Sequence, residues 1–516
     1  MDFISIFNDV LGPVMRGPSS SHTAGSYRIG LIARSLLGEE PSAAHLSFDP
    51  QGSYARTYQE QAADCGFAAG LLGWPITDGR FFSACELAAG EGLSIEFTVK
   101  PLEGATHPNT VDIRLTGRSG GTLHALAQST GGGLIVFRIV NGWSVDITGK
   151  SYELLVECDA SVGARAAELV NGLRDITRAA NPEGTRTGRL LHFVGPAAPP
   201  REAVSKIRGL PGVRAVREVA PVFFVQRGEP IFANAAEMAA RAEARRVSLG
   251  RVAVEFESVL LGFSEKEARE EMLRRWDVMR SAVEDGLHSE TIRMRLLQPA
   301  AADIMRAEAE GRLAGGGIHG RAAARSMAAL HVGSSGGVVC AAPTGASSGV
   351  LPGVLVTLVE ERKLSEEKIA LAMFAAAAVG LVVARRATFA AEVAGCQVEI
   401  GAAGAMAAAA VVEAAGGSAR QALDAAAIGL QNTMGLVCDL VQGICEVPCH
   451  TRTAAAAASA FVCADLVLGG YVNPVPLDET VDAVYTVGRM LPPELRCTSL
   501  GGLAAAPSAR NWPRLR

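Results

Sequence analysis

The chain has 516 residues, of which 49% are hydrophobic and 20% charged, so it can bury large cores and is not intrinsically disordered. A net charge of −5 provides no electrostatic basis for binding nucleic acid or an anionic membrane. No basic and apolar leader follows Met1, and ten cysteines in such a chain are typical of reduced thiols or metal ligands. We therefore expect a cytoplasmic protein of roughly two to four domains, with no nucleic-acid or membrane partner.

Residues 1–150 alternate short apolar runs with Gly, Pro and Asn turns, which predicts an α+β domain. The expected strands are 45–49, 93–99, 110–117, 134–140 and 143–149. The expected helices are 27–37 and 59–72.

The segment RGPSSSHTAGSYRIG (16–30) places a run of hydroxyl residues ahead of a helical pattern. Free N–H groups and the helix dipole at such a point favour an anion, for example a substrate carboxylate. Hydroxyl groups and His22 can add hydrogen bonds. The alternative interpretation is a serine-rich helix cap beside which His22 has no role.

Residues 151–225 are interpreted as a separate βαββαβ module, with strands at 152–158, 189–195 and 214–219 and helices at 163–173 and 200–213. Its order, length and LPGV turn are similar to those of a regulatory ACT domain. The alternative is a module of the same fold that serves only dimer packing.

From residue 232 to 516 alanine dominates and helical patterns follow one another, which predicts an all-α domain. The apolar run 369–384 is shorter than the roughly 20 residues that a membrane span needs, and we interpret it as a buried helix. A Gly-rich loop at 338–355, which contains Thr344, allows close backbone approach to a ligand.

The cysteines Cys396, Cys438 and Cys449 carry the chemistry that the sequence suggests for this domain. Thiolates suit iron–sulfur clusters, zinc or copper(I). Three thiolates on a 4Fe-4S cluster would leave one iron open as a Lewis acid, whereas ferredoxins use four cysteines and often C-x2-C runs, which this chain lacks. The alternatives are buried free thiols, or a Cys3His zinc site completed by His450. Four other cysteines are interpreted as core thiols: Cys340, Cys445, Cys463 and Cys497.

The segments GCQVEIG (395–401), GLVCD (435–439) and EVPC (446–449) resemble the three cluster-ligand segments of iron–sulfur L-serine dehydratases. GPSSSHTAG (17–25) and HPNT (107–110) resemble the substrate-binding segments of the β domain of that family. The resemblance recurs along most of the chain. It implies a single-chain form with a β-type domain at 1–150, the ACT-like domain at 151–225 and a catalytic all-α domain at 232–516.

The resemblance further implies a 4Fe-4S-dependent carbon–oxygen lyase that converts L-serine to pyruvate and ammonia, with the open iron binding the β-hydroxyl. Its partner is a small-molecule amino acid, and a homodimer is expected by analogy. Pyridoxal phosphate is not expected, because the six lysines of the chain lie in no recognisable phosphate-loop setting. The implied residues are, for metal, Cys396, Cys438 and Cys449; for catalysis, His22, His107 and Gln61; and for substrate, Ser19, Ser20, Ser21, Thr23, Gly25, Asn109, Thr344 and Arg452.

Several positions depart from the family pattern. Gln61 stands where the family has a histidine, and glutamine cannot shuttle a proton near neutral pH. Arg385 and Arg386 replace an Asn pair, and His331 replaces another polar residue of the family. Two adjacent arginines would suit a second carboxylate or a phosphate, or would form a solvent-facing helix end. The alternatives are therefore a related lyase acting on another β-substituted amino or hydroxy acid, or a non-catalytic amino-acid or redox sensor.

Overall fold

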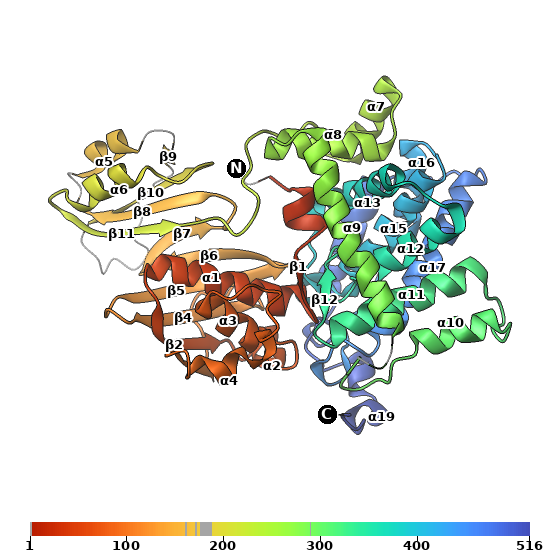
Figure 1. Ribbon diagram of the computed structural model, residues 1–516, viewed down its shortest axis with the longest axis horizontal. Helices are drawn as coiled ribbons and strands as arrows, with labels where there is room; N and C mark the ends of the chain where they lie inside the picture. The colour runs from red at the N-terminus through yellow and green to blue at the C-terminus, as the bar shows by residue number, and fades with distance from the viewer. Residues whose placement is uncertain are drawn as a thin grey trace.

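The computed structural model describes residues 3–159, 162–170, 173–175, 188–288, 290 and 292–515. Two regions that contain β-sheets lie side by side and face a large helical region (Figure 1). The arrangement confirms a multidomain protein with an N-terminal sheet region and a C-terminal helical region.

The N-terminal region is built on a six-stranded sheet of order β3-β2-β4-β5-β6-β7. β2 and β3 are parallel and the other neighbours are antiparallel. Helices α1 and α3 pack on each other, and their apolar side chains share one core with the sheet. The elements are α1 (Gly25–Leu37), β2 (Pro41–Phe48), α2 (Ser53–Thr57), α3 (Ala63–Leu72), α4 (Ala84–Ala88), β3 (Ser94–Val99), β4 (Thr110–Gly117), β5 (Thr122–Gly131), β6 (Leu134–Val140) and β7 (Trp143–Ile147).

The structure differs from the sequence analysis at two points in this region. β5 was not predicted. The helix expected at 59–72 begins only at Ala63, as α3, because Ala62 takes a left-handed conformation with φ of 55°. The turn at Ala62 directs the preceding residue, Gln61, into the protein, where its side chain is buried.

The small module has the predicted βαββαβ element order, and its sheet order is β11-β8-β10-β9 with all neighbours antiparallel. Its core is formed by apolar residues of both sheet and helices, including Val156, Phe193 and Ile207. Helix α5 ends earlier than predicted, and positions 171–172 of the predicted helix lie outside the described residues. The elements are β8 (Tyr152–Cys158), α5 (Gly163–Leu169), β9 (Arg174–Asp175), β10 (Arg189–Gly195), α6 (Arg201–Arg208) and β11 (Val213–Val219).

The C-terminal region is helical, and α13 and α15 pack at its centre. Among the described residues, three helical stretches are long and apolar enough to cross a membrane by length and composition, and 78%, 89% and 44% of their apolar windows are buried within the protein. The main helices are α7 (Ala235–Arg245), α8 (Leu249–Leu261), α9 (Glu265–Leu287), α10 (Ala301–Ala309), α11 (Gly317–Ser334), α12 (Val350–Arg362), α13 (Glu366–Arg386), α15 (Ile400–Ala414), α16 (Ala419–Asn432), α17 (Cys449–Leu468) and α18 (Leu477–Met490).

The first residues of the chain pack into the helical region rather than the six-stranded sheet. The short helix Ile6–Val10 belongs to the same apolar core as α13, and β1 (Val14–Arg16) pairs antiparallel with β12 (Val338–Cys340). The chain then leaves this pair directly into the serine-rich segment. That segment is therefore positioned at the junction of the two regions.

Candidate active site

The three cysteines predicted as ligands come from separate parts of the helical region, and two of them, Cys396 and Cys438, meet at this junction. The sulfurs of Cys396 and Cys438 and a carboxylate oxygen of Glu399 all lie within 4.8 Å of one another. Cys449, the first residue of α17, is equally buried and interacts electrostatically with Cys396. The contact between the Cys438 and Cys396 sulfurs lowers the pKa of Cys396 and raises that of Cys438, so that one of the pair readily becomes a thiolate.

A fourth thiol, which sequence reasoning assigned to the core, lies beside these three. The backbone N–H of Cys497 donates to the Cys438 carbonyl at 2.9 Å, and its sulfur is within hydrogen-bonding reach of the Cys438 sulfur. The Gln61 amide nitrogen lies 3.6 Å from the Cys497 sulfur. Sequence spacing could not reveal Cys497, because a loop far from the other cysteine segments brings it to the site. Cys497 is buried in the core, as expected, and in addition lies next to the Cys438 sulfur.

The serine-rich segment forms a single tight turn, Ser20–Ala24, at the start of α1. The Ser19 hydroxyl accepts the His22 N–H at 3.1 Å. The Thr23 hydroxyl donates to the Gln61 carbonyl at 2.9 Å, which ties the segment to the turn before α3. A Cβ at Gly25 would clash with the Ser129 hydroxyl, so glycine is required for this close approach.

His22 is fully buried within this segment, and burial lowers the pKa of its imidazole to about 4, so the ring is neutral at pH 7. Nδ1 lies 3.0 Å from the Ser21 hydroxyl, and Nε2 lies 3.0 Å from the Thr57 hydroxyl. These contacts hold the ring in place beside Ser21 and Thr57.

Glu392 links the two regions and was missed by sequence reasoning. One of its oxygens, Oε1, accepts hydrogen bonds from the Ser21 hydroxyl at 2.7 Å and from Asn109 Nδ2 at 3.0 Å. Burial opposes its charge, but the facing His22 and these two donors outweigh burial, and the pKa of Glu392 lies below its usual value. His107 also faces this carboxylate, and burial lowers the pKa of its imidazole. The only sequence signal was the position of Glu392 four residues before Cys396, in the same segment.

Glu399 differs from Glu392 in its protonation. Burial, reinforced by the neighbouring Cys396 and Glu392, raises its pKa well above the usual value, so its side chain is a neutral acid. The Thr344 hydroxyl is within hydrogen-bonding reach of it. Two carboxyl groups in one site are thus held in different states, one able to accept and one able to donate a proton.

The Gly-rich loop of Thr344 touches the serine-rich segment. A Cβ at Gly345 would lie only 2.9 Å from both the Pro18 carbonyl oxygen and the Ser20 nitrogen. Ser20 is buried at this contact. Glycine at 345 therefore allows the two loops to pack together and close the site.

The arginines singled out in the sequence are engaged within the protein. Arg452 forms an ion pair with Asp439 at 2.9 Å, donates to the Val437 carbonyl at 2.8 Å and lies beside Cys396. Arg386 pairs with Asp482 on α18, and Arg385 is exposed at the end of α13. The arginine pair therefore forms the solvent-facing helix end that was one of the two alternatives.

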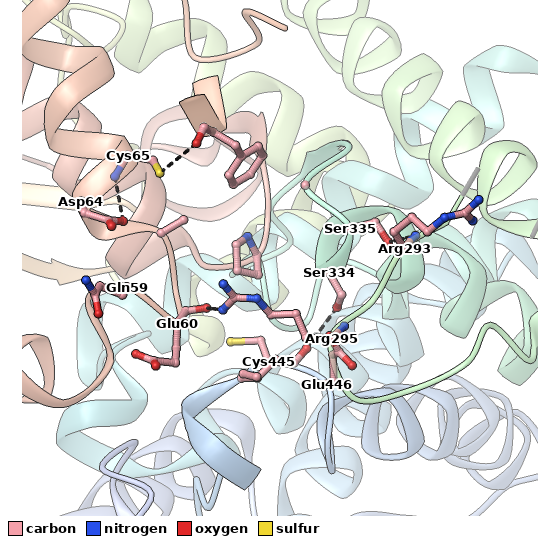
Figure 2. Close-up of a pocket in the computed structure, with 15 residues that line it drawn as sticks. Gln59, Glu60, Asp64, Cys65, Arg293, Arg295, Ser334, Ser335, Cys445 and Glu446 are labelled. Carbon is pink, nitrogen blue, oxygen red and sulfur yellow. Dashed lines mark hydrogen bonds between the residues drawn. The ribbon is translucent and has the colours of Figure 1, made fainter. Parts of the chain in front are cut away.

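A pocket of about 380 Å³ opens between the two regions, and Cys445 is one of its lining residues. Figure 2 shows Arg295 between Glu60 and Cys445 on one wall, with Asp64 and Cys65 on another. Cys445 interacts electrostatically with Cys449. The pocket thus connects the surface with the neighbourhood of the thiols.

The donor set fits an iron–sulfur group better than a Cys3His zinc site. Soft thiol donors converge in a buried place, next to a cationic guanidinium that favours their ionised form. His450, by contrast, directs Nε2 to the Ser334 hydroxyl at 3.0 Å. Among the described residues, His450 does not join Cys396 and Cys438 in a metal-binding group. His331 packs against it, with ring centroids 5.0 Å apart.

Comparison with known proteins agrees with this site. Residues 183–504 match the family model of the serine dehydratase alpha chain. The chain is 36% identical over 281 residues to a probable L-serine dehydratase alpha chain of Bacillus subtilis, which covers 54% of this chain and 94% of that protein. It is 41% identical over 156 residues to the probable beta chain from the same organism, covering 30% of this chain and 69% of that one.

L-serine dehydratase TdcG of Escherichia coli is 36% identical over 181 residues, which are 35% of this chain and 40% of that protein. The matches to both alpha and beta chains indicate that segments carried by two chains in some relatives are joined here. The chain belongs to the iron–sulfur L-serine dehydratase family and is a carbon–oxygen lyase.

Proposed function

We propose that the protein dehydrates and deaminates L-serine to pyruvate and ammonia with a 4Fe-4S cluster held by Cys396, Cys438 and Cys449. The observation that carries this proposal is the convergence of buried thiols beside a neutral acid, Glu399, with the serine-rich segment and Glu392 at the same junction. When bound, the cluster supplies a Lewis-acidic iron for the β-hydroxyl of the substrate.

The residues of the chain supply binding and proton transfer. The hydroxyls of Ser19 and Ser20 receive the substrate carboxylate, while Ser21 donates its hydroxyl proton to Glu392 and Thr23 holds the turn in shape through its bond to the Gln61 carbonyl. We assign Glu392, kept ionised and paired with the neutral His22, as the group that takes the α-proton. Glu399 donates its proton to the departing hydroxyl, so that water leaves and an enamine remains. The enamine tautomerises and hydrolyses in water to the 2-oxo acid and ammonia.

Neither Arg386 nor Arg452 is free to bind a second substrate carboxylate. Arg386 is paired with Asp482, and Arg452 with Asp439. The main-chain carbonyl of Gln61 accepts the Thr23 hydroxyl, and its side-chain amide nitrogen lies 3.6 Å from the Cys497 sulfur, so Gln61 positions these groups and does not transfer a proton. His107 acts as a second imidazole that faces Glu392.

We further propose that the βαββαβ module is ACT-like and regulatory, that two chains form a homodimer and that the enzyme works in the cytoplasm. The sheet order of the module and its antiparallel pairing support the first of these. The relatives' role in amino-acid metabolism supports the last.

The test is anaerobic purification, quantification of iron and sulfide, and measurement of 2-oxo acid formed from L-serine. Iron and sulfide in near-equal amounts together with turnover would support the proposal. Cluster without turnover on serine would redirect the substrate assignment to other β-substituted acids or to a sensor. Absence of iron after anaerobic reconstitution would contradict the mechanism.

A further inference from the structure

A second group of metal-ligating side chains lies outside the site, on the wall of the pocket. Cys65 is in the first turn of α3, preceded by Asp64, and Cys85 is on α4, which packs against α3. Their two sulfurs and a carboxylate oxygen of Asp64 all lie within 4.8 Å of one another. Figure 2 shows Asp64 and Cys65 next to each other where they line the pocket.

These distances suit a tetrahedral thiophilic cation. Zinc binds thiolates at about 2.3 Å and carboxylates at about 2.1 Å, so tetrahedral ligand atoms lie about 3.5–3.8 Å apart. The three ligand atoms need only small side-chain adjustments to reach that spacing, because they already lie within 4.8 Å of one another. All three residues are half-buried, and Asp64 and Cys65 line the pocket, which leaves room for water as a fourth ligand.

The charge distribution around the group also favours a cation. The contact with Cys85, burial and the neighbouring Asp64 all raise the pKa of the Cys65 thiol. Burial raises the pKa of Asp64, and the field of Arg295 is the weakest of the influences that lower it. Across the described part of the chain, Asp64 forms no ion pair with a basic side chain. When ionised, Asp64, Cys65 and Cys85 are all negatively charged and repel one another. A bound dication would offset this repulsion and stabilise their ionised forms.

We propose that Asp64, Cys65 and Cys85 bind one thiophilic divalent cation of the zinc class, with water as the fourth ligand. The ion joins α3 to α4 beside the pocket, and its binding is independent of the reaction and of the thiols at Cys396, Cys438 and Cys449. Cys65 and Cys85 pack against an apolar cluster that includes Trp74 and Phe81, and this cluster limits access of water from the core side.

The experiment uses the full-length, cluster-loaded protein, so that the other metal-binding thiols are occupied. Zn²⁺ is added under anaerobic conditions, free metal is removed, and bound zinc is counted by mass spectrometry while X-ray absorption at the zinc edge identifies its ligands. Iron does not contribute at that edge. Cys65→Ser and Cys85→Ser test the site, and Cys463→Ser, on α17, is the matched control.

We expect one zinc per chain in the wild type and in Cys463→Ser, with two sulfur ligands at about 2.3 Å. Binding should weaken at least tenfold in each test variant, and Asp64→Asn should retain both sulfur ligands while losing affinity. Absence of bound zinc, or retention of both sulfur ligands in Cys65→Ser, would overturn the proposal. A wild-type mass 2 Da below the reduced value, restored by a reductant, would instead identify a Cys65–Cys85 disulfide and would also overturn it.

Discussion

The hydroxyl of Ser21 donates a 2.7 Å hydrogen bond to Oε1 of Glu392, a residue 371 positions further along the chain. The bond joins the serine-rich turn before α1 to the segment that carries Cys396. Asn109, from the segment before β4, donates to the same oxygen at 3.0 Å. The site is therefore completed only when the sheet region and the helical region pack together.

Replacing Glu392 by Gln should lower kcat for L-serine by roughly 100-fold or more, the usual range for loss of a proton-transferring group. The amide retains an oxygen that can accept the Ser21 and Asn109 hydrogen bonds but has no charge. Steady-state kinetics should be measured together with iron content and circular dichroism. The assignment of Glu392 to proton transfer requires that kcat falls while the iron content stays full. A large fall in iron content instead would contradict it.

The buried His22 predicts a specific effect of pH on stability. Its pKa is about 4 in the folded protein, because burial disfavours the charged ring, but 6.5 when the chain is unfolded. The unfolded chain therefore binds the extra proton as pH falls from about 6.5 to about 4, and stability is lost over that window.

The variant His22→Gln removes this titration. Between pH 7.5 and pH 5, the midpoint of thermal unfolding should therefore fall less in the variant than in the wild type. The difference between the two falls isolates His22 from other titrating groups. Equal falls in both proteins would show that His22 is already protonated, or accessible to water, in the folded state.

The proposed function divides the thiols into those that hold the cluster and those that do not. Cys438→Ser should lose most of the iron and sulfide, since it removes one of three cluster ligands. Cys497→Ser should retain both, although its sulfur is close to that of Cys438. Iron and sulfide analysis after anaerobic reconstitution measures the effect, and Cys340→Ser, at the buried end of β12, is the control. Equal loss of iron in Cys438→Ser and Cys497→Ser would make Cys497 a ligand as well.

Sequence reasoning recovered what local residue patterns encode. The Ala-rich helical stretches and most strands were predicted, because their periodicity reflects burial of one face or of the whole element. β5 was missed, because TLHALAQSTG contains few β-branched residues and its strand conformation depends on pairing with β4 and β6. The three-residue pair β1 and β12 is too short and too distant in sequence to leave a pattern.

The candidate site likewise contains residues that local sequence patterns indicated and residues that they did not. Cys396, Cys438 and Cys449 were predicted from the short segments around them. The structure places Cys396 and Cys438 together with Cys449 nearby, and their role as cluster ligands stays a prediction. Cys497 is brought to the site by a loop far from the other cysteine segments, so no spacing could indicate it, and the only signal for Glu392 was its position four residues before Cys396. Arg386 shows the opposite case. Its charge suggested a group that binds an acidic substrate, but in the structure it pairs with Asp482, which lies on a different helix.

The contact between the two loops predicts the effect of a single added methyl group. In Gly345→Ala the new Cβ would lie 2.9 Å from two backbone atoms, the Pro18 oxygen and the Ser20 nitrogen, neither of which can rotate away. Relief of this clash must displace the serine-rich segment, which should raise KM for L-serine severalfold and cost about 1–3 kcal/mol of stability, as overpacking does.

Gly79→Ala is the matched control for this change, because a Cβ at Gly79 meets no atom within 4 Å and the residue does not require a positive φ. Its KM and unfolding midpoint should match those of the wild type. Steady-state kinetics at saturating iron and thermal unfolding measure both proteins. If Gly345→Ala lost stability but kept the wild-type KM, the serine-rich segment would not be the part of the site that binds substrate. If both variants behaved alike, the close packing of the two loops would itself be contradicted.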